Sequence, residues 1–156
     1  MTTLIRAARA ADVEAISTIL IASITQLCAD DHHGEPQAIA AWTRNKSPEG
    51  VAAMLADGER ILMLAERAGA VVAVGAVTRS GEIALNYVAP EARFSGVSKA
   101  LLAGLEQRLR ALGFEEGRLE STATARRFYQ AAGWSNDGPQ ARGRRVNGYP
   151  MRKDLS

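Results

Sequence analysis

Apolar and polar positions alternate in some stretches of the chain and recur at helical spacing in others. The alternating or short apolar stretches predict strands over residues 3–8, 60–67, 71–79, 82–88, 117–121 and 148–154, with one more strand from Trp134. Helical spacing predicts helices over 12–28, 37–42, 47–57, 97–112 and 123–132. Short turns join three consecutive strands into an antiparallel meander. We therefore predict a mixed α/β domain with a central, mostly antiparallel twisted sheet flanked by helices.

The composition bounds the class of protein. A chain of 156 residues fits one domain, and its formal net charge of only +2 does not indicate a nucleic-acid partner. The basic residues are dispersed, apart from Arg142, Arg144 and Arg145. Cys28 is the only cysteine, so no disulfide can form within the chain, and a reducing compartment is expected. Since no apolar run is long enough to span a membrane and the start lacks a signal-peptide pattern, we expect a cytoplasmic protein without a membrane partner.

Residues 87–102 carry the strongest functional signal. They predict an apolar strand, a proline turn, a loop of small residues and an amphipathic helix. The first N–H groups of such a helix are unpaired, and the helix dipole adds positive partial charge there. This arrangement suits a phosphate or pyrophosphate. The spacings of a P-loop and of a dinucleotide fingerprint are both absent, and taken alone the segment could also be an ordinary strand-to-helix turn.

Two motifs place this loop in context. Arg93-x-x-Gly96-x-Ser98 follows Tyr87-Val88-x-Pro90, and Ala125-x-x-Phe128-Tyr129-x-x-x-Gly133-Trp134 comes about thirty residues later. This pairing resembles the GNAT superfamily of acetyl-CoA-dependent N-acetyltransferases, and the likeness covers nearly the whole chain. The resemblance implies a GNAT-like fold, acetyl-CoA as cosubstrate and no metal. It also implies transfer of an acetyl group to an amine.

The resemblance also implies which residues bind acetyl-CoA. Backbone amides of the loop hold the pyrophosphate in this superfamily, which here are those of Arg93, Phe94, Ser95, Gly96, Val97, Ser98 and Lys99. The strand before the loop offers its backbone at Asn86, Tyr87 and Val88 to the pantetheine arm. Ser98 stands where the superfamily prefers glycine or alanine, and Thr122 stands where many members bind the arm with an asparagine. A solvated helix face is an equally good explanation of Lys99.

Three residues are candidates for catalysis. The resemblance implies that the Asn86 N–H polarises the thioester carbonyl and that Tyr129 is the general acid that protonates the departing sulfur. Strand alternation places Glu82 on the same face as Ala84, Asn86 and Val88, so Glu82 is the candidate base. The alternatives are a core aromatic residue for Tyr129 and a solvated carboxylate for Glu82.

The acceptor is expected to be the primary amine of a small molecule or peptide. The candidate acceptor contacts are Glu82, Trp42 and the polar pair His32 and His33, which lack the partners that a metal site would need. Trp42 is equally well explained as a core residue, and the histidines as solvent-exposed. A sensor that binds acyl-CoA without turnover is the alternative function. A homodimer is possible if the final strand forms an edge of the sheet.

Overall fold

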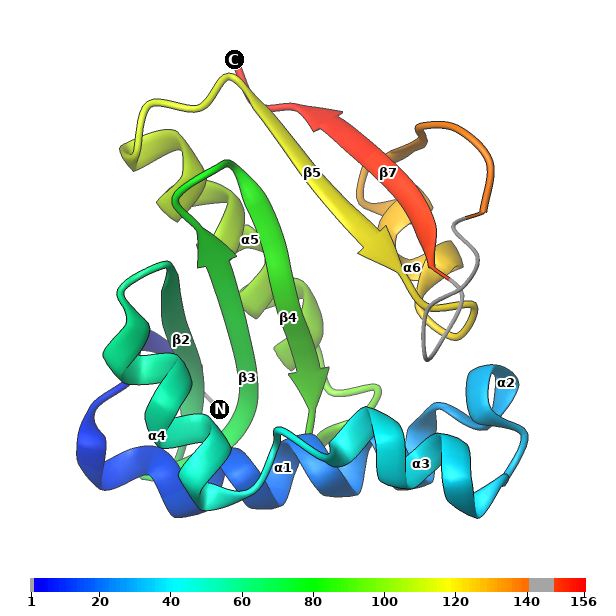
Figure 1. Ribbon diagram of the computed structural model, residues 1–156. Helices are drawn as coiled ribbons and strands as arrows, with labels where there is room; N and C mark the ends of the chain where they lie inside the picture. Colours follow the sequence, from blue (N-terminus) through cyan, green and yellow to red (C-terminus); the bar gives the residue numbers. More distant parts are fainter. Residues whose placement is uncertain (1, 141–147) are drawn as a thin grey trace.

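One seven-stranded sheet runs through the protein (Figure 1). The computed structural model describes residues 2–140 and 148–156. The strands are β1 (Leu4–Ala7), β2 (Arg60–Arg67), β3 (Ala70–Thr78), β4 (Glu82–Val88), β5 (Glu116–Ser121), β6 (Ser135–Asn136) and β7 (Tyr149–Asp154), in the spatial order β1-β2-β3-β4-β5-β7-β6. Only the β4–β5 pair is parallel. The predicted mixed α/β fold with a mostly antiparallel sheet is confirmed.

The helices also follow the predicted pattern, with small differences at their ends. They are α1 (Val13–Leu27), α2 (Ala29–His32), α3 (Pro36–Thr43), α4 (Pro48–Asp57), α5 (Val97–Ala111) and α6 (Arg126–Ala131), with single 3-10 turns at Ala10–Asp12 and Pro90–Ala92. Ser47 caps α4, because its hydroxyl accepts a hydrogen bond from the Gly50 N–H at 3.2 Å. The short α2 was not predicted and lies in the polar stretch between α1 and α3.

Each face of the sheet carries its own apolar cluster. On one face, α1 and α4 pack against β2 and β3, with Ile16, Leu20, Val51, Leu64 and Val74 fully buried. On the other face, the α5 side chains of Val97, Leu101, Leu105 and Leu109 are fully buried, and Leu112 at the end of the same stripe is partly buried. A Cβ at Gly75 of β3 would lie only 2.7 Å from a Leu105 methyl, so the glycine lets α5 approach the sheet closely.

One helical stretch, Ala10–Leu27, is long and apolar enough to cross a membrane by length and composition alone. This finding differs from the sequence-based expectation that no stretch would qualify. Its side chains Ile16, Ile19, Leu20 and Ile24 are buried in the protein. Core helices of this kind meet the same criteria, so the stretch is weak evidence for a membrane span.

The final strand β7 is not at an edge of the sheet. It pairs antiparallel with β5 on one side, from Glu116 opposite Asp154 to Ser121 opposite Tyr149, and with β6 on the other. The edges are β1 and the two-residue β6. The predicted dimer contact through the final strand was therefore based on a wrong placement of that strand.

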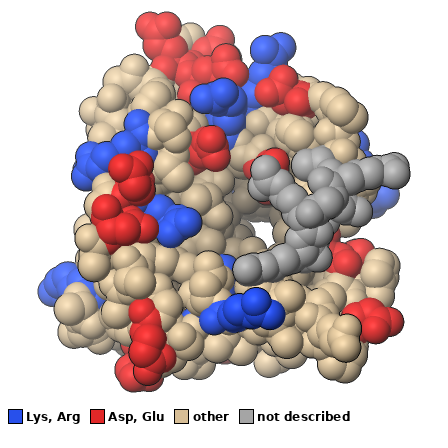
Figure 2. All heavy atoms as spheres, viewed as in Figure 1, with Lys and Arg blue, Asp and Glu red and all other residues tan. Residues whose placement is uncertain are grey.

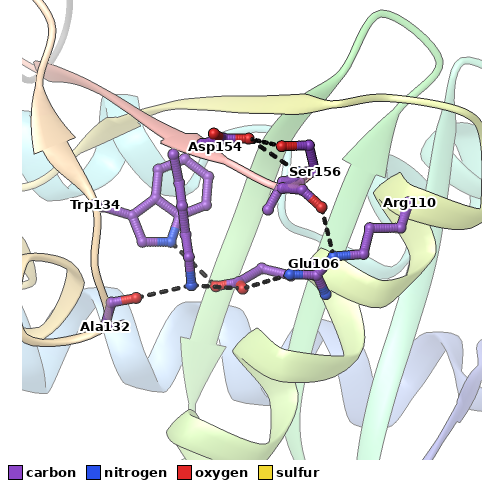
Figure 3. Close-up of polar contacts among 8 residues, drawn as sticks. Glu106, Arg110, Ala132, Trp134, Asp154 and Ser156 are labelled. Atoms are coloured by element: carbon purple, nitrogen blue, oxygen red, sulfur yellow. Dashed lines mark hydrogen bonds and ion pairs between the residues drawn. The ribbon is translucent and has the colours of Figure 1, made fainter.

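A partly buried ion pair ties α5 to β7 (Figure 3). The Glu106 side chain is only 7% exposed, and its carboxylate accepts hydrogen bonds from the Lys153 ammonium at 2.8 Å and from the Trp134 indole N–H at 3.2 Å. The same ammonium donates to the Ala132 carbonyl at 2.8 Å, just after α6. This network fixes the end of α6 against the sheet.

Candidate active site

The candidate site lies where β4 and β5 separate (Figure 1). Their ladder consists of two pairs, Glu82 with Arg118 and Ile83 with Leu119, and no pairing follows. A bulge in β4 falls at the same level, because Val77 of β3 pairs with Ile83 and Ala76 pairs with Leu85, which leaves Ala84 without a partner. The two strands therefore open into a V whose closed end is at Ala84.

The bulge changes which side chains share a face of β4. Ile83 and Val88 pack with the α5 cluster, whereas Leu85 and Tyr87 pack with the α1 cluster, so the alternation shifts by one residue between them. The prediction that Glu82 shares a face with Asn86 and Val88 is therefore wrong. Asn86 lies on the α5 face, and Glu82 lies on the opposite face.

The opening also frees backbone groups of β4. The Ala89 N–H donates to the Val72 carbonyl of β3 at 2.8 Å. Successive N–H groups of a strand point to opposite sides, so the Tyr87 N–H also faces β3, and the N–H groups of Asn86 and Val88 face the V. Since β5 has left the ladder there, these groups can receive an extended ligand.

The loop after β4 ends at the exposed N-terminus of α5. Gly96 takes the left-handed conformation (φ 84°) directly before the helix, and no side chain caps the first N–H groups. Phe94 also has a positive φ, 64°, which is uncommon for a bulky residue. The Arg67 guanidinium holds the loop by donating to the Ser95 carbonyl at 2.7 Å. Helix N-terminal amides and the cations of Arg93 and Lys99 together suit an anionic diphosphate.

A cavity of about 390 Å³ connects the loop with the V. Figure 2, which has the same view as Figure 1, shows a hollow near the middle of the molecule, where β4 and β5 part in Figure 1. Ten predicted site residues line the cavity: Asn86, Tyr87, Val88, Arg93, Phe94, Gly96, Ser98, Lys99, Thr122 and Tyr129. Six do not line it: His32, His33, Trp42, Glu82, Ser95 and Val97. The Val97 side chain is buried in the core instead.

Tyr129 lies on α6 and is held in place by a residue of β4. It is 6% exposed, and its hydroxyl accepts a hydrogen bond from the Asn86 amide at 3.0 Å. Burial raises the pKa of Tyr129 to about 12, so the phenol keeps its proton at neutral pH. Because Asn86 occupies an acceptor position of the hydroxyl, the O–H remains able to donate toward the cavity.

One carboxylate that was not among the predicted site residues also lies in this cavity. Glu120 of β5 lines it, and Glu120 also lines a second cavity on the far side of the closed end of the V. Glu82 lines the second cavity only. Nothing in the sequence distinguished Glu120 from other exposed strand residues, because its position depends on where the ladder ends.

His32 is buried at the end of α1 and supports it. The His32 ring donates through Nε2 to the Ile24 carbonyl at 2.8 Å and accepts the Gly34 N–H at Nδ1, 3.0 Å away. It also packs edge-on against the Trp42 ring. The predicted acceptor role of His32 therefore finds no support in its position, since both ring nitrogens have partners inside the protein. His33 is exposed.

Asp31 joins the two sides of the open end of the V. Its carboxylate accepts the Ala123 N–H at 2.6 Å, the Thr124 N–H at 3.2 Å and the Thr124 hydroxyl at 2.6 Å. The Thr122 hydroxyl accepts the next N–H, that of Ala125, at 3.1 Å. These contacts fix the turn that leads into α6. Local sequence patterns could not indicate these contacts, because they join residues more than ninety positions apart.

Cys28 also lines the cavity. The thiol is 5% exposed, and burial raises its pKa to about 12. A thiol that holds its proton so firmly is a poor nucleophile at neutral pH. Among the described residues, no group of three or more His, Cys, Asp or Glu side chains is placed to hold a metal ion. The arginine cluster at 142–145 lies outside the described residues.

Comparison with known proteins identifies the fold. The chain matches the family model described as "Acetyltransferase (GNAT) domain" over residues 28–155. The curated proteins contain no match. Among solved structures, a GCN5-related N-acetyltransferase from Rhodopseudomonas palustris is 23% identical with a TM-score of 0.86, over 99% of this chain and 96% of that chain.

Two further structures that are similar to this chain contain coenzyme A or acetyl-CoA. PaiA N-acetyltransferase from Thermoplasma acidophilum, in complex with coenzyme A, has a TM-score of 0.79 and 18% identity, over 99% of both chains. A phosphinothricin acetyltransferase from Sinorhizobium meliloti, in complex with acetyl-CoA, has a TM-score of 0.71 and 23% identity, over 100% of this chain and 90% of that chain. With the family match across most of the sequence, these findings show that the chain belongs to the GNAT acetyltransferase family.

Proposed function

We propose that this protein transfers an acetyl group from acetyl-CoA to a primary amine by direct attack within a ternary complex. The observation that carries this proposal is the continuity of the cavity. It runs from the uncapped N-terminus of α5, past the N–H groups of Asn86 and Val88, to the closed end of the V at Ala84. A molecule with a diphosphate at one end and a thioester at the other fits this sequence of groups.

Three features of the chain support catalysis of the transfer. The α5 amides bind the diphosphate and the β4 amides orient the thioester arm, so the reacting carbon is held in place. The Asn86 N–H donates to the carbonyl oxygen as negative charge develops there. The Tyr129 hydroxyl donates its proton to the departing sulfur. Direct attack agrees with the buried, protonated state of Cys28.

Release of free thiol from acetyl-CoA in the presence of a pool of primary amines tests the proposal. Turnover that depends on both components supports it. Binding of acetyl-CoA without any amine-dependent thiol release would favour the alternative of a non-catalytic acyl-CoA sensor. Absence of acetyl-CoA binding, measured as no rise in Tm at millimolar concentration, would contradict both functions.

A matched pair of loop variants tests the diphosphate site. Ser98 lines the cavity, and Ser95 of the same loop does not. Ser98→Asp places a carboxylate beside the bound diphosphate, and we expect its affinity for acetyl-CoA to fall about fivefold or more, since like charges a few ångströms apart repel by about 1 kcal/mol or more. Ser95→Asp should change the affinity less than threefold. Equal effects of the two variants would place the diphosphate elsewhere.

A further inference from the structure

Glu120 occupies a special place in the sheet. The last pair of the β4–β5 ladder joins Ile83 to Leu119, so Glu120 is the first residue of β5 beyond that pair. Directly across the opening lies Ala84, the bulged residue of β4. Both residues line the cavity that connects the loop with the V, and both also line the second cavity, so they mark the junction of the two cavities. A thioester whose diphosphate sits at the open end of the V would have its reacting end at this junction.

Among the described residues that line the cavity between the loop and the V, Glu120 is also the only one with a carboxylate. It lies across the sheet from Tyr129, because its neighbour Leu119 packs in the α5 cluster and adjacent residues of a strand face opposite sides. An acceptor that approaches from the face opposite to Tyr129 would therefore meet Glu120. Glu82 lines the second cavity but not the first, and the bulge at Ala84 lies between Glu82 and Asn86 along β4.

The neighbouring strand is shaped around this side chain. A Cβ built at Gly148, just before β7, would lie 3.1 Å from both the Cβ and Oε2 of Glu120. Gly148 has an ordinary backbone conformation, since its φ is not in the left-handed region. The absence of a side chain at 148 therefore serves to leave space for the Glu120 carboxylate, not to allow a turn.

We propose that Glu120, and not Glu82, takes the proton from the acceptor amine; this assignment rests on the acetyl transfer proposed above. The acceptor enters as an ammonium ion and gives one proton to the Glu120 carboxylate, directly or through a water molecule. The neutral nitrogen forms the N–C bond to the thioester carbonyl carbon, and the C–S bond breaks with its electron pair on sulfur. Tyr129 protonates the sulfur and regains a proton from the new amide nitrogen through solvent. Glu120 releases its proton to water, so the products are the amide, the thiol and one proton.

The test compares Glu120→Gln with Glu82→Gln, using ethylamine and methoxyamine as acceptors. Ethylamine is protonated at neutral pH, whereas methoxyamine is not, so only ethylamine needs a base before it can attack. We expect Glu120→Gln to lower kcat/KM for ethylamine about 100-fold, within the usual range of general base catalysis. The loss for methoxyamine should be less than about tenfold, and Glu82→Gln should stay within about threefold of wild type for both amines.

The outcomes separate the two proposals. If the wild-type protein releases thiol neither with these two amines nor with the pool of primary amines, the proposed function fails and the role of Glu120 fails with it. If the wild-type protein turns over, equal losses for both amines or equal effects of the two variants would overturn the role of Glu120 alone. Affinity for acetyl-CoA, measured by calorimetry, should be the same in wild type and both variants, which distinguishes a proton acceptor from a residue that shapes the cosubstrate site.

Gly148→Ala provides a second variant if Glu120→Gln does not fold. The added methyl group displaces the Glu120 side chain by a few tenths of an ångström without removing its charge. We expect an intermediate loss of kcat/KM for ethylamine, a smaller loss for methoxyamine and unchanged acetyl-CoA affinity. A Gly148→Ala variant with wild-type activity toward both amines would show that the position of this carboxylate does not matter.

Discussion

The buried charge of Glu106 makes the fold sensitive to its partner on β7. Lys153→Met removes the ammonium that lies 2.8 Å from the carboxylate and leaves Arg110 at 3.9 Å, on a side chain that is 41% exposed. An exposed partner at that distance compensates little, and an unpaired buried charge costs about 3–5 kcal/mol. We assign about 3 kcal/mol to the loss of the ion pair and about 1 kcal/mol to the lost hydrogen bond to the Ala132 carbonyl. The expected decrease in the free energy of unfolding is therefore about 4 kcal/mol. The expected fall in Tm is about 8–16 °C, from about 2–4 °C per kcal/mol in a domain of this size.

Urea unfolding, followed by far-ultraviolet circular dichroism and by the fluorescence of the buried Trp134, measures this loss. Glu106→Gln is the matched control, since the amide oxygen still accepts from Trp134 and Lys153 remains 23% exposed to water. It should cost about 1–2 kcal/mol. The double variant should lose less than the sum of the single losses, because its neutral amide no longer needs the ammonium. A Lys153→Met variant within about 1 kcal/mol of wild type would refute the reasoning.

Four further predictions concern the side chains of Tyr129, Cys28 and Arg6. Tyr129→Phe should lower kcat about 100-fold with little change in KM for acetyl-CoA, and a kcat within threefold of wild type would make Tyr129 a packing residue. Because burial raises the pKa of Tyr129 to about 12, wild-type kcat should show no alkaline fall below pH 10. Cys28→Ala should keep wild-type kcat under steady-state assay, whereas a large loss would indicate an acyl-enzyme route. Arg6 donates two hydrogen bonds of 2.8 Å to Asp12 and lowers the pKa of that carboxyl to about 2. The ionised carboxylate therefore stabilises the fold above about pH 4, and this contribution is lost as the pH falls toward 2. Arg6→Met should therefore flatten the stability-versus-pH curve in that window, and an unchanged slope would contradict the assignment.

The loop and its helix were predictable because their signals are local. The proline turn, the small residues around Gly96 and the leucine stripe of α5 all lie within one stretch of sequence, and the structure places them as expected. The two motifs likewise predicted the position of Tyr129 on α6. Such features follow from turn chemistry and helical periodicity, which act between near neighbours in the chain.

The bulge at Ala84 could not be predicted from periodicity. Helices cover both faces of this part of the sheet, so Ile83 and Leu85 are both buried although they point to opposite sides. Hydropathy then carries no information about which face a residue occupies, and the face assigned to Glu82 was wrong for this reason. The places of Asp31 and Glu120 depend on contacts and strand ends that are fixed only by the tertiary structure.

The insertion of β7 between β5 and β6 has a consequence for synthesis on the ribosome. β5 and β6 both leave the exit tunnel before β7 does. The edge of β5 that pairs with β7 therefore stays unpaired while the rest of the sheet can already assemble. Folding of the nascent chain can complete the half of the site formed by β4 and α5, but the half that carries Glu120 and Tyr129 gains its support only once β7 has emerged. The exposed edge of β5 is therefore where chaperones, or misdirected strand pairing, would act on the growing polypeptide.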